Sequence, residues 1–442
     1  MAYVADLRAV LAERGFRRLF ATRLISQTGD GVFNAGFAAY AFFSAQSFPN
    51  PAAAAEAFAV LYLPYSLIGP FAGVFIDRWS RRQILVWSAL IRAVLVVLAA
   101  FLVASGNLGL PLYVGALAVL GVNRFFLSAL SAGLPHVVAQ DKLVMANSVA
   151  PTTGTIVGFV GGIAGLGVHL ATGGGHLGSA ATLLVGGACY LFAGLAATTM
   201  RRDLLGPQGD PHGRSARGIP QELAAVAAGL AAGARHLWDR RPAAFALGAI
   251  TSFRFLYGIL LVMTILLYRN YFYPSGNGNA ALGHLTLVVI TSALGYLAAA
   301  LVTPSVTRQL AKTSWITSLL AAGGLVEGLL GGTFRQIPFL IAGFALGVVA
   351  QGVKICVDTT VQEYVDDAFL GRVFSLYDML FNAALVLGAV VSTPFMPVDG
   401  KSYPLIVLVA IGFLLAAAVY AVLTRGQTRS APRPHQPTPA RG

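Results

Sequence analysis

Eight ionisable side chains interrupt long apolar runs of this 442-residue chain, and they are the groups best placed to do chemistry. Four are acids and four are bases: Asp30, Glu327, Asp358, Asp378, Arg92, Arg124, Arg254 and Lys354. Carboxylates can bind and release protons, whereas arginine stays protonated and can only pair with or attract an anion. The equal numbers of acids and bases predict charge pairing inside a helical bundle, where an isolated charge is costly.

Asp30 lies in the most polar of these runs, close to Ser26, Gln27, Thr28 and Asn34. A helix that begins near residue 20 places Asp30 about 15 Å along its axis, deep in an apolar layer. A carboxyl group in a partly dry cavity could take up and release a proton there. Proton binding by Asp30 is therefore one hypothesis. A permanent ion pair with an arginine, or a helix-packing hydrogen bond, is the other.

Arg124 and Arg254 lie at comparable depths in two other runs. Arg124 follows Asn123, and Arg254 stands between Phe253 and Phe255. Neither arginine can release its proton, so each could bind a carboxylate or phosphate of a ligand or control the acid of the first run electrostatically. Internal pairing is the alternative for both.

Lys354 and Asp358 are four residues apart, a spacing that brings two side chains together on one face of a helix. This spacing favours a self-contained ion pair. No pattern in the sequence assigns a role to Glu327 or Arg92.

The overall composition shows what kind of protein carries these charges. The chain is 57% hydrophobic and 11% charged, whereas soluble proteins have about 25% charged residues. A net charge of +13 would suit nucleic acid, but the basic residues lie in short connectors rather than on one soluble face. Cys189 and Cys356 lie in apolar runs without metal-ligand spacing. We therefore predict an integral membrane protein with no nucleic-acid partner, no metal and no cofactor.

The apolar runs predict the architecture. A helix needs about 20 apolar residues to cross the hydrocarbon layer, and twelve runs reach that length. They cover residues 20–44, 56–76, 84–105, 111–133, 149–170, 179–200, 243–268, 283–305, 314–332, 337–360, 372–396 and 403–424. This pattern predicts an all-α integral membrane fold with two six-helix bundles, residues 1–200 and 243–424. A cytoplasmic linker at 201–242, with an amphipathic helix over 221–241, joins them, and a proline- and arginine-rich disordered tail covers 425–442.

The basic residues predict the topology. Of the 30 Lys and Arg, 23 fall on one side of the predicted spans, if Arg23 is counted with the N-terminal segment, and three fall on the other. Because cytoplasmic loops are enriched in Lys and Arg, we expect both termini in the cytoplasm and the protein in the inner (plasma) membrane. A weak similarity between "LGVNRFF" (120–126) and "LGVVAQG" (346–352) predicts that the two bundles are pseudo-symmetric repeats.

The loop "GVFIDRWSRRQ" after the second span concentrates charge between two apolar runs. Gly73 allows two helices to approach closely, and Asp77 at a helix end can pair with an arginine or with the amides of a neighbouring helix. Arg78, Arg81 and Arg82 supply cationic partners. Such a cluster could break and re-form as two rigid halves rock, which predicts a cytoplasmic gate. The alternative is a simple anchor on the anionic inner leaflet.

Glycines spaced by four residues mark the fifth span. Gly154, Gly158 and Gly162 form this series, and Gly161 and Gly165 lie beside it. Small residues at this spacing let two helices cross with close backbone contact. We therefore expect a helix-packing role for these glycines.

"GVFIDRWSRR" resembles the signature loop between spans two and three of the major facilitator superfamily, where a glycine, an Asp-Arg pair and two basic residues recur at this spacing. Ser80 stands where a glycine is commoner. The stretches "FRRLFATRLISQTGDGVF", "LPHVVAQDKLVMANS" and "LGRVFSL" resemble the branch that contains macrolide-efflux and enterobactin-exporter proteins. The resemblance covers nearly the whole chain through position 424.

The resemblance implies a two-lobed, twelve-helix carrier that opens to each side of the membrane in turn and exports drugs or siderophores against proton influx. Spans one, four, seven and ten would line its cavity. On these spans lie Asp30, for proton coupling, and the candidate substrate residues Asn34, Arg124, Arg254, Lys354 and Asp358. Asp378, near the cytoplasmic end of span eleven, would pair with Arg78 or Arg81. The fifth span lacks the Gly-Pro pair that proton antiporters of this superfamily often carry.

We therefore expect proton-coupled efflux of a small amphipathic compound by a monomer embedded in the lipid bilayer. A carrier for an anionic lipid or metabolite is the alternative, because Arg124, Arg254 and Lys354 are cationic. A membrane sensor or enzyme is disfavoured, since the sequence contains no catalytic motif or sizeable soluble domain.

If the charged loop is a gate, Asp77→Asn should leave the protein in the membrane but slow its cycling several-fold. The substitution removes the charge of the acid while it keeps the shape. Transport rate in sealed vesicles, normalised to the amount of protein in the membrane, measures this. A wild-type rate would reduce the loop to a topological anchor.

Overall fold

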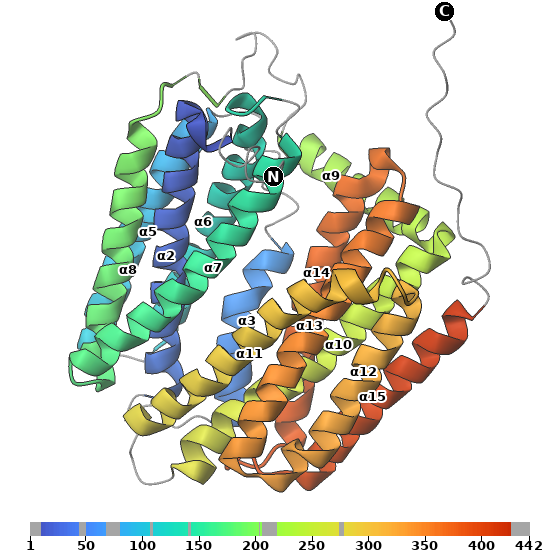
Figure 1. Ribbon diagram of the computed structural model, residues 1–442. Helices are drawn as coiled ribbons and strands as arrows, with labels where there is room; N and C mark the ends of the chain where they lie inside the picture. The colour runs from blue at the N-terminus through green and yellow to red at the C-terminus, as the bar shows by residue number, and fades with distance from the viewer. Residues whose placement is uncertain are drawn as a thin grey trace, which may run out of the picture. The chain divides into compact units, whose positions relative to one another are not determined.

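The computed structural model describes residues 10–43, 50–67, 80–106, 109–139, 143–202, 204–205, 219–273 and 278–425 (Figure 1). Every regular element in these ranges is a helix. Ten of the described helices are long and apolar enough to cross a membrane, where the sequence predicted twelve spans. The all-helical architecture agrees with the prediction, and the count of twelve stays a prediction.

Among the described residues, six long α-helices precede residue 200, at the positions of the six predicted spans. They are α2 (Arg14–Phe43), α3 (Pro51–Leu67), α5 (Arg81–Ala104), α6 (Leu110–Gly133), α7 (Leu143–Ala171) and α8 (Gly175–Thr198). α2 and α3 are not among the ten apolar helices. α2 is interrupted by charged and polar residues, and the described part of α3 has 17 residues, just under one turn short of the roughly 20 residues of a full crossing.

The remaining helices begin with α9 (Ile219–Asp239), which coincides with the predicted amphipathic helix. α10 (Arg241–Leu266) continues into a π-helical turn, η4 (Leu267–Phe272). Then follow α11 (Gly278–Val306), α12 (Lys312–Leu329), α13 (Gln336–Tyr364), α14 (Asp367–Ser392) and α15 (Tyr403–Thr424). The last of these has the bounds predicted from its apolar run.

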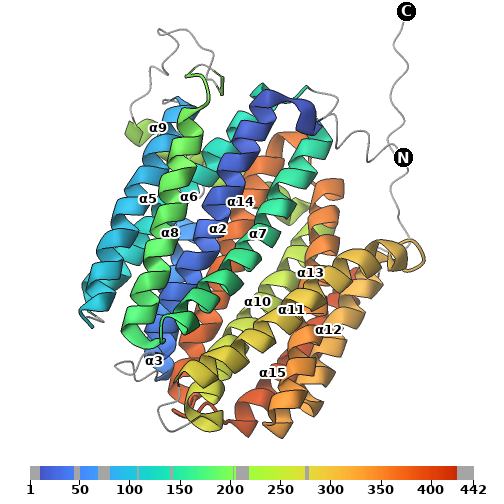
Figure 2. The same cartoon turned by 60° about the vertical axis from the view of Figure 1, so that its left-hand side comes forward.

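Packing groups the described residues into two compact units. The first draws on residues 1–231, 257–286 and 374–402, and the second on 232–256, 287–373 and 403–442. In the first unit α2 packs against α7 and α8, and α5 packs against α6 and α8 (Figure 2). In the second unit α12 packs against α13 and α15. The division by chain order into 1–200 and 243–424 stays a prediction, and the predicted tail lies almost wholly outside the described residues.

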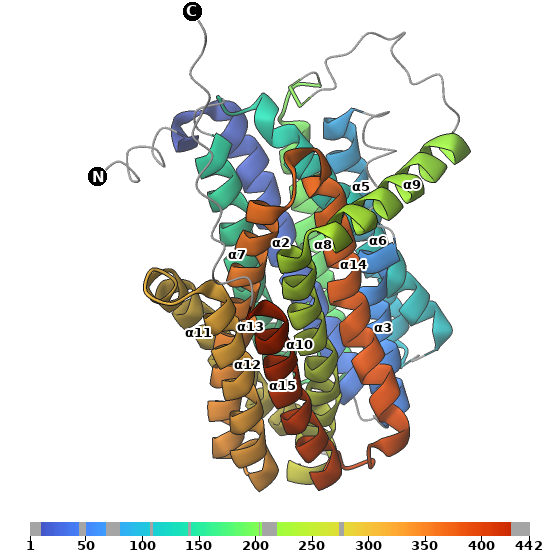
Figure 3. The same cartoon turned by 90° about the vertical axis from the view of Figure 1, so that its right-hand side faces the viewer.

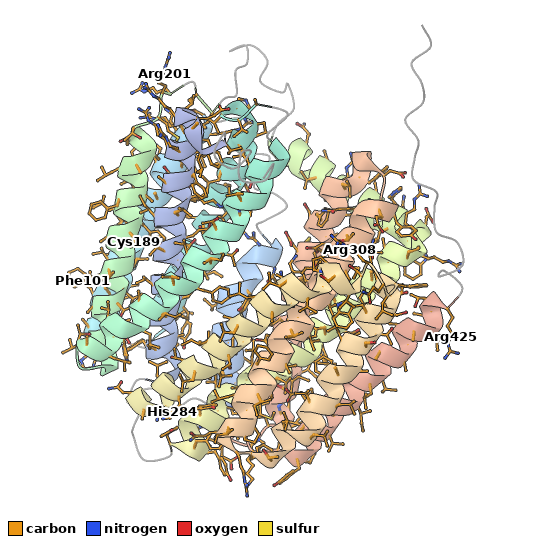
Figure 4. The ribbon with its side chains drawn as sticks, in the orientation of Figure 1. Phe101, Cys189, Arg201, His284, Arg308 and Arg425 are labelled. Atoms are coloured by element: carbon orange, nitrogen blue, oxygen red, sulfur yellow. The ribbon has the colours of Figure 1, made fainter. Side chains whose placement is uncertain are left out.

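α5 shows how these helices divide into a lipid-facing side and an inner side. Trp87, Val94 and Phe101 recur every seven residues and are all exposed, and Phe101 projects away from the helices in Figure 4. The opposite face carries Leu85 and Arg92, which are completely buried. A continuous apolar stripe of this size suits hydrocarbon rather than water.

Glycines bring the backbones of α2 and α7 together. A Cβ atom at Gly31 of α2 would overlap the carbonyl oxygen of Gly158 of α7, and one at Gly161 would overlap the carbonyl oxygen of Thr28. Without Cβ atoms at these positions the two helices cross at a distance that larger residues would not allow.

The predicted packing glycines differ in the space that a Cβ atom would have at each position. Cβ atoms at Gly158 and Gly162 would have ordinary van der Waals room, with nearest atoms at 3.6 Å and 3.7 Å. A Cβ atom at Gly154 would overlap the side chain of Gln27, which can move aside more easily than backbone. The tightest position of α7 is therefore Gly161, which lies outside the predicted four-residue series.

In the second unit, the segment that contains the end of α9 is tied to the start of α14 (Figure 3). Arg240 donates two hydrogen bonds to the Asp366 carboxylate, at 2.9 Å and 3.0 Å. The ring of His236 stacks on Phe369 with centroids 4.3 Å apart. The amphipathic helix is thus attached by specific contacts as well as by its apolar face.

Gly161→Ala should lower the stability of the protein by about 1–3 kcal/mol, because the added methyl group meets backbone that cannot rotate away. Thermal unfolding of the purified protein in detergent measures the loss. Gly162→Ala is the matched control, since it makes the same change one residue away where there is room. Equal melting temperatures for the two variants would contradict the close crossing of α2 and α7.

Candidate functional site

The first unit is organised around the guanidinium group of Arg92 on α5, which has no exposed surface. Its Nη1 donates hydrogen bonds to Asp30 Oδ1 at 3.0 Å and to Asn123 Oδ1 at 2.6 Å. Its Nη2 donates to Ser26 Oγ at 2.8 Å, and its Nε donates to the carbonyl oxygen of Ser88 at 3.3 Å. All three guanidinium nitrogens therefore have acceptors.

Two aromatic rings complete the surroundings of this cation. The guanidinium carbon of Arg92 lies 4.5 Å from the centroid of Phe126 and 4.3 Å from that of Tyr190. Aromatic faces attract cations, and the attraction strengthens where water is absent. The Tyr190 hydroxyl also donates to Asp30 Oδ1 at 2.8 Å, and Asn123 Nδ2 donates to Asp30 Oδ2 at 3.3 Å.

Four helices contribute to this cluster. Asp30 and Ser26 come from α2, Arg92 from α5, Asn123 from α6 and Tyr190 from α8. On α5, the exposed apolar residues Trp87, Val94 and Phe101 occupy one face of the helix, so Arg92 on the opposite face points to the interior. We call the hydrogen-bonded set of Asp30, Arg92, Asn123, Tyr190 and Ser26 the Arg92 network.

Exposure differs sharply across the central ion pair. The Asp30 side chain keeps 19% of its surface accessible, whereas that of Arg92 keeps none. Arginine does not release its proton under any physiological condition. The member of the pair that can exchange a proton, and that can be reached, is therefore Asp30. The ion pair anticipated as one of the two hypotheses for Asp30 is present, but its arginine is Arg92.

The other predicted cavity residues lie apart from this network. Asn34 is exposed and follows Asp30 by four residues on α2, so both lie on one helical face. The partners of Asp30 do not include Arg124, although it adjoins Asn123. Arg254, on α10 in the second unit, is almost completely buried.

Two acids of the second unit differ in their partners. On α13, Lys354 Nζ donates to Asp358 Oδ2 at 2.5 Å, so the pair expected from the four-residue spacing is formed. Glu327 on α12 is 3% exposed and has no hydrogen-bonding or ionic partner among the residues that the structure describes. Its nearest neighbours include Gly331 and Ile406.

The predicted gate is described in part. Gly73, Asp77 and Arg78 lie outside the described residues. Arg81 Nη1 donates to the carbonyl oxygen of Leu205 at 3.0 Å and lies 3.3 Å from the His136 ring, and Arg82 Nη2 donates to the carbonyl oxygen of Thr198 at 2.8 Å.

These contacts join the start of α5 to the ends of α6 and α8 within the first unit. None of the hydrogen bonds of Arg81 with described residues reaches Asp378, whose backbone carbonyl accepts a hydrogen bond from Asn382. A partnership of Asp378 with Arg78 stays a prediction.

Sequence reasoning assigned no role to Arg92 and did not single out Tyr190. A tyrosine in an apolar run carries no special signal, so Tyr190 could not have been singled out. Arg92 could have been placed: the seven-residue spacing of Trp87, Val94 and Phe101 marks the lipid face of its helix, and Arg92 lies on the other side.

Comparison with known proteins identifies the family. No family model matches the chain. However, an MFS-type transporter of Mycobacterium bovis and one of Mycobacterium tuberculosis are each 35% identical to it over 422 residues, which cover 95% of this chain and 94% of theirs. The chain belongs to the major facilitator superfamily. It is a multi-pass membrane transporter.

Solved structures of several transporters share the fold. The nucleoside transporter NupG superposes with a TM-score of 0.61 at 15% identity, over 95% of this chain and all of the other. The POT family transporter PepTSo gives 0.65 at 15% identity, over 95% and 99% of the two chains. A bacterial homologue of the lysosomal transporter Spinster gives 0.66 at 12% identity, over 95% and 99%. At these identities the likeness extends to the fold alone.

Removing either charge of the central ion pair should have unequal effects on stability. Asp30→Asn leaves a sealed cation that cannot lose its charge, and we expect a loss of about 3–5 kcal/mol. Arg92→Gln leaves an acid that can reach solvent and be neutralised, so its loss should be smaller. Thermal unfolding of both single variants and of the double variant Asp30→Asn/Arg92→Gln measures this, and the double variant should be more stable than Asp30→Asn. The reverse order would contradict the burial of Arg92.

Proposed function

We propose that the protein is a secondary active transporter that exports a small amphipathic compound in exchange for protons, and that Asp30 is the proton-binding carboxyl group. The observation that carries this proposal is the ion pair between a partly accessible acid and a sealed arginine inside the membrane span. The direction of transport rests on the resemblance of three stretches of the chain to efflux proteins.

The ion pair offers a way to convert proton binding into a change of helix contacts. With Asp30 ionised, its carboxylate holds α2 against the Arg92 guanidinium of α5. Protonation removes the charge of the carboxyl group, which reduces the contact to a weaker hydrogen bond and leaves Arg92 to Asn123, Ser26 and the two aromatic rings. Asp30 therefore binds a proton more weakly when α2 is held against α5 by the ion pair than when the two helices are apart. Coupling requires such a difference in proton affinity between two conformations.

The gate and the cavity follow from the family pattern. Arg81 and Arg82 hold the start of α5 against the ends of α6 and α8. Because these two arginines are engaged within one unit, Asp77 and Arg78 are left as the residues of the gate that break and re-form their contacts. Asn34 lies one helical turn from Asp30 and is the candidate for a neutral polar contact with the substrate.

An anionic lipid or metabolite is the alternative substrate. Arg124 and Arg254 would supply the positive charge that such a substrate needs. The third cation of this group, Lys354, is already neutralised by Asp358, which weakens the case for an anion. A compound with cationic or neutral polar groups and an apolar body is therefore favoured as the substrate.

Proton coupling is tested in sealed vesicles with an imposed pH gradient and a panel of cationic, neutral and anionic compounds. The wild-type protein should drive one class of compound against its gradient. Asp30→Asn should abolish the dependence on the pH gradient, because an amide cannot bind the proton, whereas Asp30→Glu should retain part of it. The double variant Asp30→Asn/Arg92→Gln repeats the test in a protein without the unpaired buried cation.

Glu327→Gln is the control, because it removes the charge of an acid that is buried elsewhere and belongs to no ion pair among the described residues. It should leave gradient-driven transport unchanged. Undiminished pH-driven transport by both Asp30→Asn and the double variant would remove Asp30 from the coupling role. Transport confined to anionic compounds and lost in Arg124→Ala would select the alternative substrate class.

A further inference from the structure

A second feature of the first unit lies at one end of α2 and α8, where an open pocket has a volume of about 410 Å³. Arg14, Arg17, Arg18 and Ala21 of α2 line one side, and Ala196 and Thr199, at the end of α8, line the other. Neither the Arg92 network nor the predicted gate includes any of these residues. We call this feature the arginine pocket.

The charges of the arginine pocket are largely uncompensated. Arg18 donates to the carbonyl oxygen of Thr199 at 2.8 Å, which fixes its side chain at the wall. The side chains of Arg14 and Arg17 have no hydrogen-bonding or ionic partner among the described residues, and both residues are exposed. The neighbouring acid, Glu13, does not line the pocket. Three guanidinium groups therefore face one cavity without a carboxylate in its wall.

The backbone adds to this positive field. α2 begins at Arg14, so the amide groups of its first turn and the positive end of its dipole lie at the pocket. Guanidinium groups offer pairs of donors whose spacing matches the oxygens of a phosphate group, which they bind in bidentate fashion. The chemistry of the wall thus fits a phosphate ester.

The apolar surface next to the pocket indicates where that phosphate would come from. Val185, Phe192, Ala196 and Thr199 share one face of α8, and Phe192 is 59% exposed directly along the helix from the pocket. The candidate membrane span of α8 ends at Thr198, so the pocket lies at the level where head groups meet hydrocarbon. Figure 4 shows further nitrogen-bearing side chains at this end, around the labelled Arg201.

We propose that the arginine pocket binds the phosphate group of an anionic phospholipid, with the acyl chains along the exposed apolar face of α8. Arg14 and Arg17 contact the phosphate oxygens, and Arg18 closes the site against Thr199. The lipid occupies the periphery of the first unit, so this site is separate from the transported substrate and does not depend on the direction or coupling of transport.

The proposal is tested on the full-length protein in neutral detergent at about 150 mM salt, where non-specific charge attraction is screened. Phosphatidylglycerol, phosphatidylcholine and inorganic phosphate are titrated separately while the melting temperature is followed, because a ligand of the folded state raises it. Retention of each lipid in native mass spectrometry gives a second reading. Arg14→Gln/Arg17→Gln is the test variant. Arg308→Gln/Arg425→Gln removes two exposed charges elsewhere and is the matched control (Figure 4).

We expect phosphatidylglycerol to stabilise the wild type and the control alike, and to bind the test variant at least about tenfold more weakly. If inorganic phosphate stabilises the wild type as strongly as the lipid does, and the test variant loses this too, the site takes phosphate from a soluble source. Equal binding of phosphatidylglycerol by wild type and test variant, or equal stabilisation by phosphatidylcholine, would overturn the proposal.

Discussion

The burial of one guanidinium group constrains four helices of the first unit. Arg92 cannot neutralise itself by losing a proton, so every nitrogen that leaves water must find an acceptor and the charge must find an anion. The acceptors and the anion come from α2, α5 and α6, and α8 adds the aromatic ring of Tyr190. The helices are therefore joined by a polar network in a medium where apolar surfaces provide little force for association. The need to neutralise the buried charge of Arg92 thus explains both the packing of these helices and the ion pair with Asp30.

The two partners of the ion pair are not equivalent. One partner is permanently charged and sealed, and the other is titratable and partly accessible. A buried pair in which both partners were sealed would be an inert cross-link, and one in which both were exposed would contribute little. In the proposed mechanism the accessible acid takes up a proton, while Asn123, Ser26 and the two aromatic rings continue to stabilise the charge of Arg92. That is the property expected of a coupling element in a carrier of this superfamily.

The sequence predicted features that depend on local residue patterns, and it did not predict contacts between residues far apart in the chain. Spans such as α6 and α15 were placed to within a residue or two, because hydrocarbon thickness alone sets the length of an apolar run. α2 begins at Arg14, earlier than predicted, since a helix can continue into the interface after its apolar part ends. The Arg92–Asp30 contact joins residues 62 positions apart, and no local pattern states which of four basic residues an acid will meet. The importance of Gly31 was likewise hidden, because close contact depends on the crossing point of two helices rather than on either sequence alone.

The crossing of α2 and α7 has a mechanical consequence. Backbone lies against backbone at Gly31 and Gly161, with no side chains between them to change rotamer and absorb a displacement. Rotation of either helix about its own axis would bring a larger residue into the place of a glycine, where a Cβ atom has no room. We therefore expect the two helices to move together, so that a displacement of α2 on the proposed protonation of Asp30 would also move α7, on which no residue of the Arg92 network lies.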